Sequence, residues 1–359
     1  MTGKKPSRVT LKPSRVTMKD VAVAAGVSQS TVSFVLNGLE DMRIGAETKD
    51  RVLAAAERLG YRHRSAGRPA SRNVTRVIGM LVDEIATSPF AAISIEGAQE
   101  QAWSQGTVRD VAMTGGDPDY ENVVLKRWEQ DGVAGVIYAS ILTREVSPPA
   151  LLARHRAILL NCADAQGRLP GVVPAERRGS EAATTALIEA GCRRVAFVSG
   201  EPWMAASQQR EEGYRRALAT HGITPDPALI LEGNFLPSGG RAATLRLMQA
   251  ADPPEAIFCA NDLMAVGAYE AIKELGLRVG RHVAVMGYDD QEIAQHLAPP
   301  LSTVLLPHRE MGQWCALRLL DDKPMGSEAF RIPCPLVPRA SHYLQRWRGG
   351  EGREGDAGK

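Results

Sequence analysis

Ten residues near the start of the chain carry side chains that could read DNA bases. Drawn as a helix, residues 28–37 (SQSTVSFVLN) have two faces. One face holds Thr31, Val35, Ser28, Val32 and Leu36, and the other holds Gln29, Ser33, Asn37, Ser30 and Phe34. The second face has short polar groups and one ring but no carboxylate, as a helix between two walls of phosphate requires. The pattern predicts a helix that enters the major groove.

The flanking residues predict two further helices that would hold this one. Residues 20–25 form a short helix of small apolar side chains, Gly26 permits a turn, and Ser28 stands at an N-cap position. A third helix is expected over residues 46–59, where apolar side chains recur at helical spacing until Gly60. The alternative is a three-helix cap without a DNA-binding role, which the distribution of charge disfavours.

Charge is divided unevenly along the chain. The first 76 residues carry 15 Lys and Arg against 6 Asp and Glu; the whole chain has 43 and 41, which leaves 28 and 35 for the remainder. A basic head on an acidic body indicates a polyanion bound at one end, although a basic tail can also act only as a solubiliser. The motif KPSRVT occurs at residues 5–10 and again at 12–17, within a segment typical of a disordered arm.

The body of the chain has the pattern of parallel sheets flanked by helices. From residue 77 to about 336, short apolar runs alternate with helical stretches. The runs are VIGMLV, GVIYA, AILL, VAFVSG, AIFCAND and VAVMGYDD. They are too many for one sheet, and a Gly- and Pro-rich segment at 167–180 marks a break. We therefore predict an α/β fold with two lobes and a cleft between them.

The expected organisation has five parts. They are a disordered arm (1–16), a helix-turn-helix headpiece (17–61), a linker (62–76), a two-lobed domain for effector binding and dimerisation (77–345) and a disordered tail (346–359).

Polar residues follow several predicted strands, where a ligand between two such lobes would bind. Asn261 and Asp262 follow one strand, Asp289 and Asp290 follow another, and Arg210 precedes a helix. These groups suit sugar hydroxyls because each can make paired hydrogen bonds. For Asn261 and Asp262 a helix N-cap is an equal alternative, and for Asp290 a structural role is favoured.

Further residues would complete this predicted site. Phe90 and Phe235 lie on loops and could cover the face of a sugar ring. Asp83 and Glu84, just after the first strand, could add carboxylates to the cleft.

The sequence also resembles that of a known family. The run VTMKDVAVAAGVSQSTVSFVLNG, followed by ETKDRVLAAAERLGY, resembles the headpiece of the lac repressor (LacI/GalR) family, and the resemblance extends over nearly the whole chain. It implies that Gln29, Ser30 and Phe34 read bases. The residues that it implies for a further groove contact or for phosphate contacts are Met18, Thr17, Ser28, Thr31, Asn37 and Thr48.

The resemblance also bears on the effector. It places Arg210, Asp289 and Phe235 on effector contacts through the patterns RxxGY, GYDD and GxF, and it matches Phe90 and Asn161 more loosely. Two long phrases, at 82–103 and 287–312, resemble a branch of the family associated with carbohydrate metabolism. The resemblance thus implies a repressor that a sugar-like effector controls allosterically.

Two features depart from the family. Phe34 replaces the usual Arg or His, so it would contact a thymine methyl instead of guanine. The linker has His63, Gly67 and Ala70 where relatives have Pro, Ala and Leu, which disfavours a hinge helix that wedges into the minor groove. We expect its arginines to contact DNA electrostatically; a tether without DNA contact is the alternative.

The sequence also indicates the partners and the cellular compartment of the protein. One headpiece reads few base pairs, so a homodimer, or a tetramer, on a near-palindromic double-stranded operator is expected. No apolar run is long enough to cross a membrane and no secretory signal is evident, which predicts a cytoplasmic protein without a membrane partner. Five scattered cysteines give no metal site or disulfide pattern.

Two rival functions are weaker. One is a carbohydrate enzyme with an appended DNA-binding domain, but catalytic and cofactor motifs such as GxSxG, HExxH and GxGxxG are missing, so neither catalysis nor a cofactor is expected. The other is a sugar-binding module like the periplasmic receptors, which the headpiece argues against.

Overall fold

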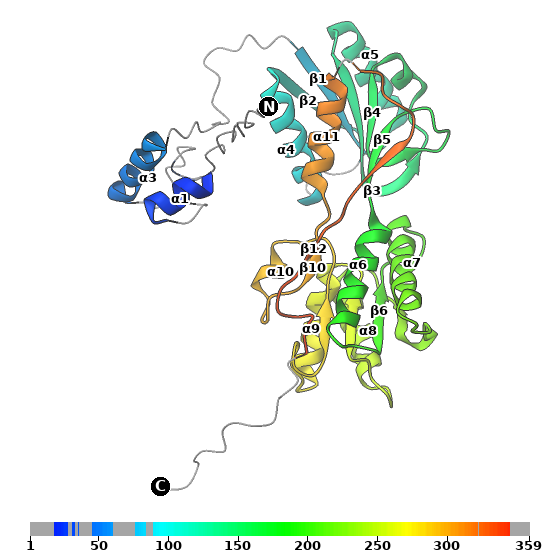
Figure 1. The fold of residues 1–359 in the computed structure, drawn as a ribbon. Helices are drawn as coiled ribbons and strands as arrows, with labels where there is room; N and C mark the ends of the chain where they lie inside the picture. Colours follow the sequence, from blue (N-terminus) through cyan, green and yellow to red (C-terminus); the bar gives the residue numbers. More distant parts are fainter. Residues whose placement is uncertain are drawn as a thin grey trace, which may run out of the picture. The chain divides into compact units, whose positions relative to one another are not determined.

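The computed structural model describes residues 18–27, 31–32, 35, 45–59, 76–83, 89–321 and 323–344 (Figure 1). Its contacts divide the chain into two compact units, Met1–Asn73 and Val74–Lys359, which are taken separately below. The predicted arm, the tail and the linker up to residue 75 lie outside the described residues, as does most of the predicted base-reading helix.

The first unit contains helices α1 (Met18–Ala25) and α3 (Ala46–Arg58). Their facing sides, together with Val32, form a small core, built from Val21, Ala22, Ala25, Val32, Val52, Ala55 and Ala56. Gly26 ends α1 with a positive φ of 66°, as a turn into a following helix requires. Val32 is completely buried, which agrees with the inward face of the predicted helical wheel.

The first lobe of the second unit is a six-stranded sheet in the order β11-β5-β4-β3-β1-β2, and every pairing in it is parallel. Its strands are β1 (Arg76–Val82), β2 (Thr107–Met113), β3 (Gly135–Val146), β4 (Ala157–Asp164), β5 (Gly171–Pro174) and β11 (Ala329–Ile332). Successive side chains of a strand point to opposite faces. Met80 and Val82 therefore pack beneath helices α4 (Pro89–Ser104) and α11 (His308–Leu320), whereas Leu81 packs beneath α5 (Pro118–Asp131) and η1 (Ala150–Arg154).

The second lobe has a four-stranded parallel sheet in the order β7-β6-β8-β9. The strands are β6 (Val195–Ser199), β7 (Ile230–Glu232), β8 (Ala256–Cys259) and β9 (Ala284–Met286). The surrounding helices are α6 (Glu176–Glu189), α7 (Ala205–Thr220), η2 (Pro227–Leu229), α8 (Pro237–Met248), α9 (Asp262–Glu274) and α10 (Ile293–His296). Residues of the sheet and of helices α6 to α9 share one hydrophobic core.

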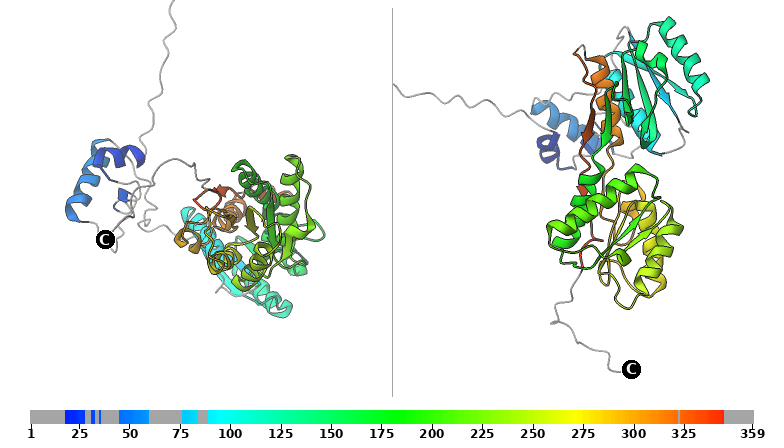
Figure 2. Two further views of the ribbon diagram at one scale, coloured as in Figure 1. Left: turned by 90° about the horizontal axis from the view of Figure 1, so that it is seen from below. Right: turned by 90° about the vertical axis from the view of Figure 1, so that its right-hand side faces the viewer.

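The chain crosses between the lobes repeatedly (Figure 2). It first passes from β5 into α6, at the break that the sequence predicts. It returns after β10 (Thr303–Val304) to form α11 and β11 in the first lobe, and then crosses again to β12 (Leu336–Val337), which pairs antiparallel with β10. The sequence interpretation did not anticipate this return. None of the helices in the described ranges is long and apolar enough to cross a bilayer.

Close packing brings the middle of α4 against the first turns of α11. A Cβ added at Gly97 would lie 2.1 Å from the carbonyl oxygen of Arg309, and one added at Gly312 would lie 2.1 Å from that of Ser94. Only glycine allows the two backbones to approach so closely. The contact fixes Ser94 beside His308, the first residue of α11.

Candidate functional site

Strained backbone gathers at the ends of the strands. In the described part of the chain, four residues other than glycine have a positive φ: Asn161 (58°), Phe235 (56°), Asp289 (109°) and Asp290 (54°). Each lies at or just after the carboxyl-terminal part of a strand: β4, β7 or β9. Such conformations cost about 1–3 kcal/mol each and persist where the surrounding structure enforces them, commonly at functional sites. Three of the four are predicted effector residues.

Arg210 lies within α7 and not before a helix as the sequence predicted, and a buried network holds it in the second lobe. Its Nε and Nη2 donate to the two carboxylate oxygens of Glu176, at 2.8 and 3.0 Å, and its Nη1 donates to the carbonyl oxygen of Ala260. The guanidinium lies 3.8 Å from the ring centroid of Tyr288, and Nη1 is 3.4 Å from a carboxylate oxygen of Asp289. Because Arg210 is only 3% exposed, this network fixes the guanidinium in one orientation.

Burial and neighbouring charges have opposing effects on the pKa values of Arg210 and Asp289. Burial alone would lower the pKa of Arg210, but the charges of Glu176 and Asp289 hold it above its ordinary value. Burial raises the pKa of Asp289 to about 6, and the charge of Arg210 only partly opposes that rise. Asp289 also accepts a hydrogen bond from Gln291 Nε2 at 3.2 Å.

Asn261 fixes the loop that carries Phe235. Its Oδ1 accepts a hydrogen bond from the backbone N–H of Met264 at 2.9 Å and so caps α9, the alternative that the sequence left open. Its Nδ2 donates to the carbonyl oxygen of Phe235 at 3.0 Å. The ring of Phe235 lies over Gly200, where an added Cβ would come within 2.0 Å of Cζ. The ring is thus held at the carboxyl end of β6.

The carboxylates of two further aspartates in this lobe are bonded to other groups of the protein. Asp262 is fully buried, and its carboxylate accepts from Thr303 Oγ1 at 2.6 Å and from the backbone N–H of Gln291 at 2.7 Å. Burial, followed by the charge of Asp289, raises the pKa of Asp262 to about 8. Asp290 pairs with Arg339 at 2.7 Å, the structural role that the sequence favoured.

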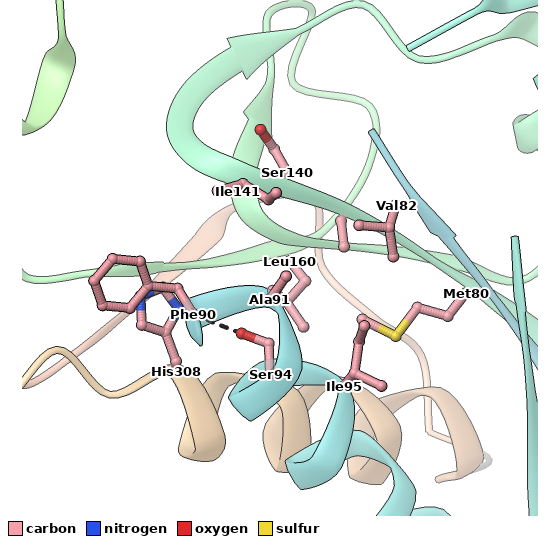
Figure 3. Close-up of a pocket in the computed structure, with 11 residues that line it drawn as sticks. Met80, Val82, Phe90, Ala91, Ser94, Ile95, Ser140, Ile141, Leu160 and His308 are labelled. Carbon is pink, nitrogen blue, oxygen red and sulfur yellow. Dashed lines mark hydrogen bonds between the residues drawn. The ribbon is translucent and has the colours of Figure 1, made fainter. Parts of the chain in front are cut away.

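The first lobe has a mostly apolar pocket between β1, β3, α4 and α11 (Figure 3). Phe90 lies at one side of it and stacks on His308, with ring centroids 4.9 Å apart and an interplanar angle of 28°. Ser140 and Ile141, from β3, form another wall. The pocket lies at the carboxyl ends of strands in this lobe.

Asn161 holds the wall of that pocket. Its Nδ2 donates to the carbonyl oxygens of Ser140 and Ile141, at 3.1 and 2.8 Å, and its Oδ1 accepts from Thr143 Oγ1 at 2.7 Å. These bonds fasten the stretch where the pairing of β3 with β4 shifts register. The side chain positions the pocket, and its predicted contact with an effector stays a prediction.

Asp83 supports the same stretch. It accepts from the backbone N–H of Ile141 at 3.1 Å and pairs with Arg144. Glu84, which the sequence added as a second carboxylate, lies outside the described residues.

Sequence reasoning did not single out Ser94, Glu176 or His308. Each contacts the site through a partner far away in the chain, as do Ser94 and His308, which are 214 positions apart. No local pattern marks a pairing of that kind.

In the headpiece, the structure describes only some of the predicted DNA-contact residues. Met18 begins α1, Thr31 is half-buried, and the half-buried Thr48 donates its backbone N–H to the carbonyl oxygen of Gly45. The other predicted DNA contacts lie outside the described residues: Thr17, Ser28, Gln29, Ser30, Ser33, Phe34 and Asn37. These assignments stay predictions.

Comparison with known proteins decides the family. Residues 17–63 match the family model described as "Bacterial regulatory proteins, lacI family". The chain is 32% identical over 330 residues to the HTH-type transcriptional repressor PurR of Vibrio atlanticus, a match that covers 90% of this chain and 97% of that protein. The chain belongs to the LacI family.

Other LacI-family proteins align over similar lengths. The ribose operon repressor of Haemophilus influenzae is 31% identical over 313 residues, covering 87% of this chain and 93% of that protein. Among solved structures, a complex of the transcriptional regulator CelR with cellobiose is 28% identical with a TM-score of 0.62, covering 91% of this chain and 100% of that one. The lac repressor dimer bound to operator and the anti-inducer ONPF is 26% identical, also with a TM-score of 0.62, covering 92% and 100%.

LacI-family membership confirms several predictions. Residues 184–342 match a periplasmic binding protein-like domain, and the second unit has the two parallel-sheet lobes expected of it. The predicted fold class is therefore confirmed. The chain is a DNA-binding transcription repressor with an effector domain and not an enzyme.

Proposed function

We propose that this LacI-family repressor controls genes of carbohydrate metabolism and that a small, uncharged, sugar-like effector between its lobes changes its affinity for operator DNA. The main support is the strained backbone at Asn161, Phe235 and Asp289, which lie on the strand ends of both lobes. Strain at these positions is expected where side chains are preorganised for a ligand.

The charges at the strand ends support an uncharged ligand. Arg210 is paired with Glu176 and Asp289, and Arg144 is paired with Asp83. Because these guanidinium groups are already neutralised by carboxylates, they offer little attraction to a phosphate. A neutral molecule with several hydroxyl groups suits the site better than a phosphosugar.

The relatives point in two directions on ligand class. The ribose operon repressor and the CelR–cellobiose complex favour a sugar. Several relatives named PurR make a free nucleobase the competing class. The polar strand ends and the aromatic rings of Phe90 and Phe235 lead us to the sugar.

The proposed working unit is a cytoplasmic homodimer on a near-palindromic operator. A dimeric lac repressor bound to operator is among the similar structures. Two headpieces related by a two-fold axis would read two half-sites. Any change in DNA affinity on effector binding must be matched by an equal change in effector affinity on DNA binding.

Thermal unfolding of the full-length protein tests the effector class. We expect D-ribose, D-glucose, D-galactose or cellobiose to raise the melting temperature, since a ligand at 100 times its Kd stabilises the native state by about 2.7 kcal/mol. Glucose 6-phosphate is expected to give no rise. If adenine or guanine raises the melting temperature and all four sugars leave it unchanged, the ligand class is wrong.

Footprinting on the DNA upstream of its own gene tests the DNA contacts. We expect a two-fold symmetric protected site, and substitutions Gln29→Ala and Phe34→Ala should each cost about 1–3 kcal/mol at one base position of each half-site. Glu57→Ala, on the exposed side of α3, is the matched control and should leave site preference unchanged. The assignment fails if both positions are replaceable without any change in the preferred sequence.

A further inference from the structure

His308 has a buried nitrogen that the protein does not use. The residue is 4% exposed, and its Nε2 has no hydrogen-bond partner in the part of the chain that the structure describes. Leaving a buried polar group unpaired costs about 1–3 kcal/mol, so most such groups have a partner. A phenylalanine would fill the same space without this cost. The unpaired Nε2 is therefore a candidate hydrogen-bonding group for a ligand.

The ring of His308 lines the first-lobe pocket together with Phe90, Ser140 and Ile141 (Figure 3). It also begins α11, directly after the segment that returns from the second lobe. In that segment, the backbone N–H of Leu306 donates to the carbonyl oxygen of Asp289 at 3.3 Å. The backbone just before His308 thus contacts the strained, buried Asp289 of the second lobe.

The partner of the other ring nitrogen determines where the imidazole proton lies. Ser94 Oγ is 3.3 Å from Nδ1, and the structure gives the Ser94 hydroxyl no other acceptor among the described residues. We assign its single proton to Nδ1, because the opposite tautomer would leave both the Ser94 hydroxyl proton and Nε2 without a partner. In a neutral imidazole that accepts at Nδ1, the ring proton lies on Nε2. Nε2 is then a hydrogen-bond donor.

The imidazole is neutral under ordinary conditions. Burial, followed by the charge of Arg210, lowers the pKa of His308 to about 4. A neutral donor in a largely apolar pocket suits an uncharged oxygen better than an anion.

We propose that the Nε2–H of His308 donates a hydrogen bond to a hydroxyl or ring oxygen of the effector and so selects ligands with an acceptor at that point. This inference rests on the proposed function. The ring of Phe90, stacked on His308, would pack against the adjacent apolar part of the same ligand. Because His308 begins α11 beside the crossing segment, the contact would join ligand recognition to the connection between the lobes.

Substitutions at His308 separate recognition from folding. His308→Phe keeps a ring to stack on Phe90 but removes the donor. We expect the sugar that binds the wild type among D-ribose, D-glucose, D-galactose and cellobiose to bind this variant about 10- to 100-fold more weakly. The ligand-free variant should have about the stability of the wild type, because the unpaired Nε2 is removed but the buried hydroxyl of Ser94 loses its acceptor. His308→Gln, whose amide can reach the Nε2 position, should recover part of the affinity.

A second buried histidine provides the control. His342 is 2% exposed and has Nδ1 2.6 Å from Ser302 Oγ, an arrangement like that of His308 and Ser94. His342→Phe is expected to lower the melting temperature and to leave sugar affinity unchanged. Equal loss of affinity in His308→Phe and His342→Phe would point to a purely structural effect and would overturn the proposal.

Nitrogen NMR of the imidazole groups in the ligand-free protein tests the donor directly. We expect a protonated Nε2 and an unprotonated Nδ1 for His308; the opposite tautomer overturns the inference whichever ligand binds. If only adenine or guanine binds and His308→Phe weakens it, the sugar class fails but His308 keeps its role. If His308→Phe binds the active probe as tightly as the wild type does, the role of His308 is excluded.

Discussion

Replacement of Arg210 by methionine is expected to lower the free energy of unfolding by about 3–5 kcal/mol, because it leaves buried carboxylates without their cation. Glu176 and Asp289 are 1% and 8% exposed, and both face the guanidinium. Methionine matches the length of the stem but donates no hydrogen bond to either. Equilibrium unfolding in urea, followed by circular dichroism, measures the difference.

The matched control is Arg177→Met. Arg177 pairs with Glu212 at 3.0 Å between the same two helices, but about half of each side chain is exposed. Exposed pairs contribute about 0–1 kcal/mol, so the control should be nearly neutral. Arg210→Lys should fall between the two, since it keeps the charge but not the paired bonds to Glu176. Similar unfolding curves for the two methionine variants would show that the buried network does not stabilise this lobe.

The sequence predicted six of the strands. The apolar runs that became β1, β3, β4, β6, β8 and β9 are all continuous and largely buried, so their composition alone marks them. The edge strands β2, β7 and β11 were not anticipated, whereas the edge strand β9 was. In β2 and β11, buried and exposed positions are mixed with charged residues such as Arg109 and Arg331, because one edge of each strand meets solvent. Composition therefore gives a weaker signal there.

The candidate site shows the same limit at the level of side chains. Residues at strand ends were found because parallel strands end at one edge of a sheet, which explains Phe235, Asn261 and Asp289. Their partners were not found, because Glu176 and His308 reach the site from distant helices. The sequence also gave no reason to expect that Asn161 and Asn261 use their amides to fix loops.

Asp262 gives a prediction of comparable size in the dependence of stability on pH. Burial raises the pKa of its carboxyl group to about 8, whereas an unfolded aspartate titrates near a pKa of about 3.9. Between these values the folded state holds a proton that the unfolded state has lost. The free energy of unfolding should therefore fall as pH rises from about 4 to about 8, by at most about 1.4 kcal/mol per pH unit from this group.

Asp262→Asn removes that titration and isolates its contribution. Asparagine keeps the size and can still accept from Thr303, although it loses one acceptor facing Gln291. At pH 5.5 the free energy of unfolding of the variant should be similar to or lower than that of the wild type. By pH 8 it should have risen relative to the wild type by a few kcal/mol. Asp289 titrates in the same direction with a pKa of about 6 and His308 in the opposite one, but both are present in the two proteins. Asp119→Asn, at an exposed carboxylate in the first turn of α5, is the control for the loss of one surface charge. A pH-independent difference between Asp262→Asn and the wild type would mean that Asp262 stays ionised in the folded state, with its hydrogen bonds and the N-terminus of α9 outweighing its burial.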